Sequence, residues 1–415
     1  MKKLLLCLPL LLTLLVSGCQ APPIAQPNVN DNGANLDSIG KTIKGNDEFG
    51  LNLYTKYKTK DGNIFFSPYS ISSALAMTYE GAKGQTAAEM QKVFGFLADP
   101  TDRRSSFAKI YNDLNAKNED YQLNTANALW VQKDFPFLAD YLNLVEKYYG
   151  GKATNLDFIN QTEQSRQTIN QWVEKKTNNK IQNLLPQGSV SGDTRLILTN
   201  AVYFKGTWLF PFEKSSTQKK DFQLTPTNTV TVDMMQLYGK KFKYSETNKL
   251  QALEIPYKGD KISMLILLPK NNDLAYLENN LNLKNLNEWK TSMNSEKVTV
   301  FLPKYKFDTK YDMAQDLTQL GMPTAFNCSL ADFSGMTGKT DLCIDQVIHK
   351  AFIEVDEQGT EAAAATAVIM KTSMAGPTQP EKIYFFNADH PFIFLIQDKQ
   401  SGNILFLGRV SDPTK

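Results

Sequence analysis

The spacing of apolar residues changes part-way along the chain, and this change restricts the possible folds more than any other feature. Three stretches carry apolar residues at helical intervals: 69–80, 105–115 and 163–178. Strand-like runs follow at 123–131, 196–204, 252–257, 262–268, 298–302, 349–355, 392–396 and 404–410. Helices early and hairpins late predict an α+β domain with large, mostly antiparallel sheets.

No break in composition and no internal repeat follows residue 40, so residues 41–415 are expected to form one domain. Lys and Arg number 45 against 43 Asp and Glu, and this balance implies no nucleic acid or other polyanion as a partner. The only histidines are His349 and His390, and CxxC and HExxH patterns are missing. We therefore expect no metal site and no cofactor.

The N-terminus has the pattern of an export signal. Residues 1–18 combine two lysines with an apolar stretch too short to span a bilayer, which is typical of a signal peptide. The end of this stretch, 16–19, resembles a bacterial lipobox, which implies cleavage before Cys19 and its acylation; an ordinary leader is the alternative. Residues 19–40 are rich in Pro and Asn and predict a flexible linker. We expect an exported, membrane-anchored lipoprotein that faces the periplasm or the cell exterior.

Two cysteines, Cys328 and Cys343, belong to the domain itself. Both lie among apolar or small residues. A disulfide bridge and a pair of free, buried thiols are equally compatible with this sequence.

Searches for catalytic motifs give no match. There is no GxSxG elbow or dinucleotide fingerprint, and the phosphate-loop likeness of 338–340 fails because position 333 is Phe. His349 stands alone in an apolar run, which is typical of a hydrogen-bonded core residue. Asp389 and His390 are neighbours in an extended segment, so their side chains would point apart. The chain is not expected to be an enzyme.

The segment 354–383 allows two interpretations. Local propensity favours a short helix over 360–368 and then an exposed loop. A strand-like alternation places Thr360, Ala362, Ala364 and Thr366 on one face, which is small and uncharged. A strand that enters a packed sheet would need such a face, because bulky or charged side chains would not be accommodated.

Five collinear stretches resemble the serpin family, and together they extend over residues 45–412. They are the segments 63–72, 200–208, 354–367, 388–394 and 406–410. The resemblance implies three sheets, about nine helices and an exposed reactive loop at about 357–383. It also implies suicide inhibition of serine, or cysteine, proteases. The protease attacks a bait bond in the loop, and the cut loop inserts into the large sheet as an extra strand, which traps the acyl-enzyme.

The resemblance assigns roles to individual residues. The hinge of the reactive loop corresponds to Glu357, Gly359, Thr360, Ala362, Ala363, Ala364 and Ala365. The sheet-opening region corresponds to Ser67, Ser70, Asn200 and His349, which should form a buried hydrogen-bonded cluster, and Trp208 marks the point where the loop first enters.

The bait bond is placed by counting from Glu357, which puts cleavage between Ser373 and Met374. Ser373 suits an elastase-like protease. A shift of one residue gives Met374, which suits chymotrypsin-like pockets, or Thr372, and a shift of two gives Lys371, which suits trypsin-like pockets. We expect a monomeric inhibitor whose partner is an elastase-like or chymotrypsin-like protease. The rival is a non-inhibitory serpin that acts as a binding or chaperone-like module.

Overall fold

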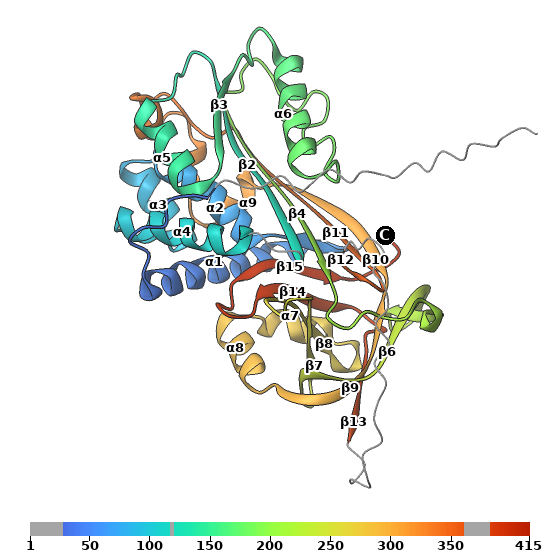
Figure 1. Ribbon diagram of the computed structural model, residues 1–415. Coiled ribbons are helices and arrows are strands. Elements are labelled where there is room, and N and C mark those ends of the chain that lie inside the picture. The colour runs from blue at the N-terminus through green and yellow to red at the C-terminus, as the bar shows by residue number, and fades with distance from the viewer. Residues whose placement is uncertain (1–27, 117–119, 361–381) are drawn as a thin grey trace, which may run out of the picture.

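Two hydrogen-bonded sheets, one of nine strands and one of six, form the centre of the protein in the computed structural model (Figure 1). The structure describes residues 28–116, 120–360 and 382–415. Among these residues no helix is both long enough and apolar enough to cross a membrane. The described part of the chain also contains no group of three His, Cys, Asp or Glu that could hold a metal ion.

Ten α-helices occur in the described residues. They are α1 (Leu36–Tyr57), α2 (Pro68–Tyr79), α3 (Gly84–Phe94), α4 (Pro100–Asn115), α5 (Ala139–Tyr149), α6 (Thr162–Lys176), α7 (Leu274–Asn280), α8 (Leu283–Thr291), α9 (Ala314–Leu320) and α10 (Ser334–Thr337). Helix α2 lies beneath the six-stranded sheet and contacts β2 and β4, and nearly all of its residues are buried. Helix α6 covers the opposite face of this sheet, where its Ile169 and Val173 pack on Trp130.

The nine-stranded sheet has the order β1-β15-β14-β8-β7-β6-β9-β13, with β5 paired to β6. Its strands are β1 (Ile64–Phe66), β5 (Gln218–Thr225), β6 (Asn228–Glu246), β7 (Leu250–Pro256), β8 (Ile262–Pro269), β9 (Asn294–Pro303), β13 (Ile383–Asn387), β14 (Phe392–Asp398) and β15 (Ile404–Val410). The six-stranded sheet has the order β10-β11-β12-β4-β2-β3. Its strands are β10 (Tyr305–Asp312), β11 (Gln346–Val355), β12 (Gly359–Thr360), β4 (Leu196–Thr207), β2 (Tyr121–Gln132) and β3 (Lys152–Leu156).

The predicted α+β class is confirmed, and every strand predicted from the sequence is present. The sequence resemblance implied three sheets, whereas the described strands form two hydrogen-bonded networks. Strand β6 explains this difference, because its 19 residues pair with β5 near one end and with β7 near the other, and with β9 between them.

Helix α1 was not predicted, because Gly40, Gly45 and Gly50 lower its intrinsic helix propensity. Tertiary packing supplies the reason for two of these glycines. A Cβ on Gly45 would lie 2.8 Å from the carbonyl oxygen of Phe94, and one on Gly50 would lie 2.5 Å from the ring of Pro68. The glycines therefore allow α1 to lie close against α3 and the start of α2.

The three glycines give a direct test of this packing. Gly50→Ala is expected to lower the free energy of unfolding by about 1–3 kcal/mol, because the added methyl group overpacks the contact with Pro68. Gly40 lies in the same helix, and a Cβ there would meet nothing within 4 Å. Gly40→Ala should therefore raise stability by up to about 1 kcal/mol. Urea unfolding of both variants checks this, and equal effects would show that α1 packs differently.

Helix α1 begins before the predicted domain boundary. Residues 36–40, which the sequence analysis assigned to the linker, lie in α1, and the Asn35 side chain accepts a hydrogen bond from Ser38 N–H at 2.9 Å. Val29 is buried, and its N–H donates to Asn112 Oδ1 at 3.0 Å. The part of the linker that the structure describes is thus attached to α4.

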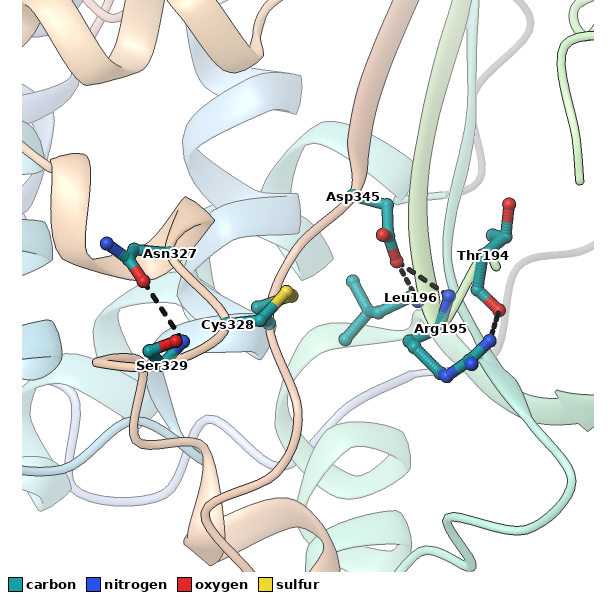
Figure 2. Close-up of a disulfide and its surroundings, with 8 residues drawn as sticks. Thr194, Arg195, Leu196, Asn327, Cys328, Ser329 and Asp345 are labelled. Atoms are coloured by element: carbon teal, nitrogen blue, oxygen red, sulfur yellow. Dashed lines mark hydrogen bonds between the residues drawn. A yellow bond between two sulfur atoms is a disulfide. The ribbon is translucent and has the colours of Figure 1, made fainter. Parts of the chain in front are cut away.

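A disulfide joins Cys328 to Cys343, with 4.7 Å between their Cα atoms (Figure 2). The alternative of two buried free thiols is thereby excluded, and only Cys343 is buried. Two residues after this bridge, Asp345 Oδ2 accepts hydrogen bonds from Arg195 N–H at 2.7 Å and Leu196 N–H at 2.8 Å (Figure 2). Asp345 thus fastens the start of β11 to the start of β4, while the bridge ties the segment before β11 to the segment that follows residue 327.

Candidate functional site

Strands β4 and β11 lie side by side for only part of their length. They pair in parallel from the Ile197–Gln346 pair to the Tyr203–Phe352 pair. Beyond that point they are separated by β12, whose Thr360 pairs with Gly206 on one side and Val355 on the other. We call this boundary between β4 and β11 the seam. The two residues of β12, Gly359 and Thr360, occupy the open end of the seam.

Gly359 fits this position because it has no side chain. A Cβ at this residue would lie 2.0 Å from the carbonyl oxygen of Gly206 and 2.8 Å from the Cα of Thr207. The preceding residues are held by the backbone, since Trp208 N–H donates to the Gln358 carbonyl and Phe212 N–H to the Glu357 carbonyl, each at 2.8 Å. Any other residue at 359 would therefore push β12 away from β4.

Thr360 faces the interior of the protein. Its side chain is 1% exposed, and its Oγ1 lies 2.6 Å from the hydroxyl of Tyr257. The Tyr257 ring stacks on Trp208 at a centroid distance of 4.5 Å, and Trp208 Nε1–H donates to the Asp356 carbonyl at 3.0 Å. The alternation in the sequence placed Thr360 on an inward face, and the burial agrees. The space beneath it is closed by two aromatic rings and accepts only a small side chain.

Glu357 forms a buried ion pair at the entrance of the seam. Its carboxylate accepts hydrogen bonds from Lys304 Nζ at 2.9 Å and Thr217 Oγ1 at 2.8 Å, and Glu357 is 3% exposed. Burial opposes ionisation, but the hydrogen bonds from Lys304 and Thr217 outweigh it and hold the pKa of Glu357 below its usual value. Glu357 thereby links the hinge to the strand pair β9–β10.

A row of polar side chains crosses the closed part of the seam. Asn127 of β2 lies opposite Asn200 of β4, and Asn200 lies opposite His349 of β11. The His349 ring is hydrogen-bonded through Nδ1 to Asn200 Oδ1, and its Nε2 accepts from Ser67 N–H at 3.2 Å. Asn200 Nδ2 also donates to Ser70 Oγ at 2.7 Å. The four residues expected to form a buried cluster are therefore brought together, at the start of α2.

Trp208 lies beside the hinge and outside this cluster. Eight residues separate it from Asn200, which is about 26 Å along an extended chain. The remaining predicted residues of the loop, Ala362, Ala363, Ala364 and Ala365, with Lys371, Thr372, Ser373 and Met374, lie outside the described residues, as does Cys19.

Comparison with known proteins identifies the family that has this architecture. The profile of the family Serpin (serine protease inhibitor) matches residues 44–413. A serpin-like protein of Methanosarcina acetivorans is 41% identical over 370 residues, which cover 89% of this chain and 85% of the relative. The human leukocyte elastase inhibitor is 42% identical over 380 residues, 89% of this chain and 98% of the inhibitor.

The chain belongs to the serpin family. The solved structure of human thyroxine-binding globulin, in complex with thyroxine, matches with a TM-score of 0.82 at 30% identity and covers 91% of this chain and all of that one. The relatives thus include a protein named as a protease inhibitor and one named for binding a small molecule.

Three residues of the serpin's seam were missed in the sequence: Asn127, Tyr257 and Lys304. Asn127 carried a signal, since it is an amide within an apolar strand, as is Asn200. Tyr257 ends a strand-like run, and Lys304 follows Pro303, so neither has a local pattern that predicts its contact. Both contacts join segments that are at least 50 residues apart, Lys304 to Glu357 by 53 and Tyr257 to Thr360 by 103.

The buried imidazole makes the stability of the seam sensitive to acid. Burial lowers the pKa of His349 to about 3, and its Nε2 must stay unprotonated to accept from Ser67 N–H. The unfolded value is about 6.5. The contribution of neutral His349 is therefore complete above pH 6.5 and is lost as the pH falls toward 3, by up to about 5 kcal/mol. Urea unfolding between pH 7 and pH 3 checks this. His349→Gln should weaken the dependence of the free energy of unfolding on pH. An unchanged pH dependence in this variant would contradict the assignment of the effect to His349.

Proposed function

We propose that this serpin inhibits serine proteases, or cysteine proteases, as a suicide substrate. The observation that carries the proposal is the position of Gly359 and Thr360, which are paired with both β4 and β11 at the open end of the seam. The alanines at 362–365 follow after Glu361. A strand that continued from Thr360 along the seam would place small side chains against the packed interior at its first four inward positions, 360, 362, 364 and 366.

The reaction begins at the bait bond, which we place between Ser373 and Met374. The nucleophile of the protease attacks the carbonyl carbon of Ser373 and forms an acyl-enzyme, while the peptide that starts at Met374 leaves with a free amino group. The freed segment 359–373 has 15 residues and spans about 50 Å as a strand. That length is sufficient to carry an attached protease across the domain before water releases it.

Insertion must separate β4 from β11 along the closed part of the seam. The parallel pairing of 346–352 with 197–203 is lost, and the hydrogen bond between His349 and Asn200 is broken. Each backbone hydrogen bond lost between β4 and β11 can be replaced by one to the inserted strand. Because that strand pairs on both of its sides, the sheet gains a second set of backbone hydrogen bonds. The gain favours insertion, and the buried cluster opposes it until the bait bond is cut.

An elastase-like or chymotrypsin-like protease is the proposed target. Ser373 is small, as an elastase-like pocket requires, and Met374, the first alternate, suits a chymotrypsin-like pocket. The similarity to the leukocyte elastase inhibitor supports this class. We infer a monomer that needs no cofactor and has no catalytic activity of its own.

Incubation with elastase, chymotrypsin and trypsin tests the proposal. A denaturant-resistant complex on a gel is expected with at least one of the first two. The mass of the released C-terminal peptide then identifies the bond, since cleavage after Ser373 releases a peptide that starts at Met374, and cleavage after Met374, Thr372 or Lys371 releases one that starts at Ala375, Ser373 or Thr372. Cleavage by all three proteases without a complex would contradict inhibition.

The second candidate function is a non-inhibitory binding or chaperone-like module. The structural similarity to thyroxine-binding globulin favours this candidate. The small residues at 362–365 argue against it, because a loop that never inserts has no need of them. Formation of a covalent complex separates the two functions directly.

We further propose that the serpin is an exported lipoprotein, anchored to a membrane through Cys19. The signal-like residues 1–18 support export, and so does the disulfide between Cys328 and Cys343, because such bonds persist mainly in oxidising compartments. Cys19→Ser is expected to move the protein from the membrane fraction to the soluble fraction. An unchanged distribution after fractionation would contradict acylation, and Cys7→Ser serves as the control within the leader.

A further inference from the structure

Three large apolar side chains are exposed together on the outer face of the nine-stranded sheet, at the edge formed by β13. Phe385 is 64% exposed, Tyr238 is 59% exposed and Ile383 is 44% exposed. Phe385 lies opposite Thr299 of β9, and Tyr238 lies in the bulge that interrupts the pairing of β6 with β9. We call these three side chains, with Thr299 between them, the β13 patch.

The bulge explains how the patch is built. The pairing of β6 with β9 shifts between Leu237 and Lys240, and Gly239 N–H donates to Thr299 Oγ1 at 3.3 Å. Tyr238 and Phe385 therefore flank Thr299 from opposite sides. Thr299 is itself 5% exposed, so a small covered residue lies between two exposed aromatic rings.

The border of the patch carries positive charge. Lys220 Nζ lies 4.5 Å from the ring centroid of the half-buried Phe301, which is next to Thr299 along the same face of β9. Lys382 is not part of this border, because its Nζ lies 4.2 Å from the ring centroid of Tyr384, which points to the other face of β13 than Ile383 and Phe385. The surface thus offers an aromatic centre with the cation of Lys220 at its border, which complements an apolar contact beside a carboxylate.

The exposure of the aromatic rings in the β13 patch indicates a binding partner. Phe386, the next residue after Phe385, is fully buried, so β13 already has an aromatic side chain that packs on the core. Phe385 adds nothing to that core contact and presents its ring to water. Exposed aromatic residues that lie together are typical of binding surfaces, where they supply much of the affinity.

The place of β13 in the chain identifies the partner. Strand β13 is the first element after the reactive loop, and it projects from the end of its sheet, at the bottom of Figure 1. Ile383 follows Ser373 by ten residues, which span at most about 35 Å. A protease domain of about 230 residues has a radius of gyration of about 17 Å. The surface of a protease seated on the bait bond is therefore within reach of the patch.

We propose that the β13 patch is a docking surface for the target protease, which it contacts outside the active-site cleft. The inference rests on the proposed inhibitory function and adds a second contact to the reactive loop. A second copy of this chain is the poorer occupant. Three side chains of at most about 200 Å² each bury too little for a stable dimer, whereas they add usefully to a complex that the loop already holds.

The test measures docking without trapping. Full-length protein is titrated with elastase and chymotrypsin whose catalytic serine is replaced by alanine, so that no acyl-enzyme forms. The double variant Tyr238→Asp/Phe385→Asp is compared with Leu330→Asp, which alters a residue of similar exposure, 65%, on the disulfide-bonded segment. All altered side chains are exposed, and thermal unfolding confirms that each variant is folded.

The double variant is expected to bind about tenfold more weakly than the wild type, while Leu330→Asp stays within about twofold. Equal binding by the double variant and the wild type would overturn the docking surface, as would an absence of wild-type binding to both inactive proteases. A wild type that dimerises through the patch, with unchanged protease binding by the double variant, would overturn it as well. Failure of the proposed inhibition is a separate result, because it is scored with active protease as a missing covalent complex.

Discussion

Replacing Thr360 by arginine is expected to convert this serpin from an inhibitor into a substrate of the same protease. Thr360 is 1% exposed, and its hydroxyl lies 2.6 Å from that of Tyr257, whose ring stacks on Trp208. An arginine at this position would have to bury its guanidinium beneath the sheet without a carboxylate partner. Burial of an unpaired charge costs several kcal/mol, so the first step of insertion becomes unfavourable.

The competition between insertion and hydrolysis sets the size of this effect. An increase of about 3 kcal/mol in the barrier slows insertion by a factor of about 100, which leaves time for water to release the protease. The number of serpin molecules consumed per protease inhibited should rise at least about tenfold, and the denaturant-resistant complex should fade on the gel. Thr360→Ser keeps the hydroxyl and the small volume and should behave as the wild type. Unimpaired trapping by Thr360→Arg would show that the side chain at 360 does not have to face the packed interior during insertion.

Much of the strand pattern could be predicted because burial on one or both faces leaves a local signature. The hairpin over 252–268 corresponds to β7 and β8, and the run at 404–410 corresponds to β15. These strands consist largely of buried apolar residues between turn residues. The resemblance then supplied the family fold, which periodicity alone does not contain.

Strand β6 shows where this signature is absent. Its 19 residues include three lysines and an exposed Tyr238, and its alternation is interrupted by the bulge at 237–240. The exposed lysines face solvent, so the strand has no continuous apolar side. The bulge that interrupts the alternation of β6, and so removes its sequence signature, also places Tyr238 in the β13 patch.

The contacts of the seam could be predicted only in part. Ser67, Ser70, Asn200 and His349 came from the resemblance, and the structure joins them through hydrogen bonds that span up to 282 residues of chain. No local rule pairs Lys304 with Glu357, because the attraction depends on the register of two strands. Sequence therefore indicates which residues are unusual, and topology decides which of them meet.

The seam is fastened at three levels. Asp345 holds its closed end, the pair His349–Asn200 crosses its middle, and Glu357 with Lys304 fixes the hinge at its open end. In the proposed mechanism, insertion starts at the open end. The Glu357 pair lies beside that starting point.

Glu357→Lys is accordingly expected to destabilise the protein by about 3 kcal/mol, because position 357 is buried and its new ammonium would have no carboxylate partner, whereas the Lys304 side chain is 37% exposed. The new ammonium would lie close to Lys304 Nζ, and Thr217 Oγ1 would lose its acceptor. Glu354 is the matched control, since it pairs with Lys306 at 3.3 Å on the neighbouring surface, where Lys306 is 60% exposed. Glu354→Lys should cost less than about 1 kcal/mol.

Thermal and urea unfolding of the two charge reversals measure this difference. The variant Lys304→Glu/Glu357→Lys restores an opposite pair at the same place and should recover a large part of the lost stability. Recovery would assign the loss to the ion pair, because any steric effect of a lysine at 357 would persist in the double variant. Equal losses for Glu354→Lys and Glu357→Lys would instead mean that the hinge is held by its backbone bonds to Trp208 and Phe212, and that the carboxylate has no special part in closing the seam.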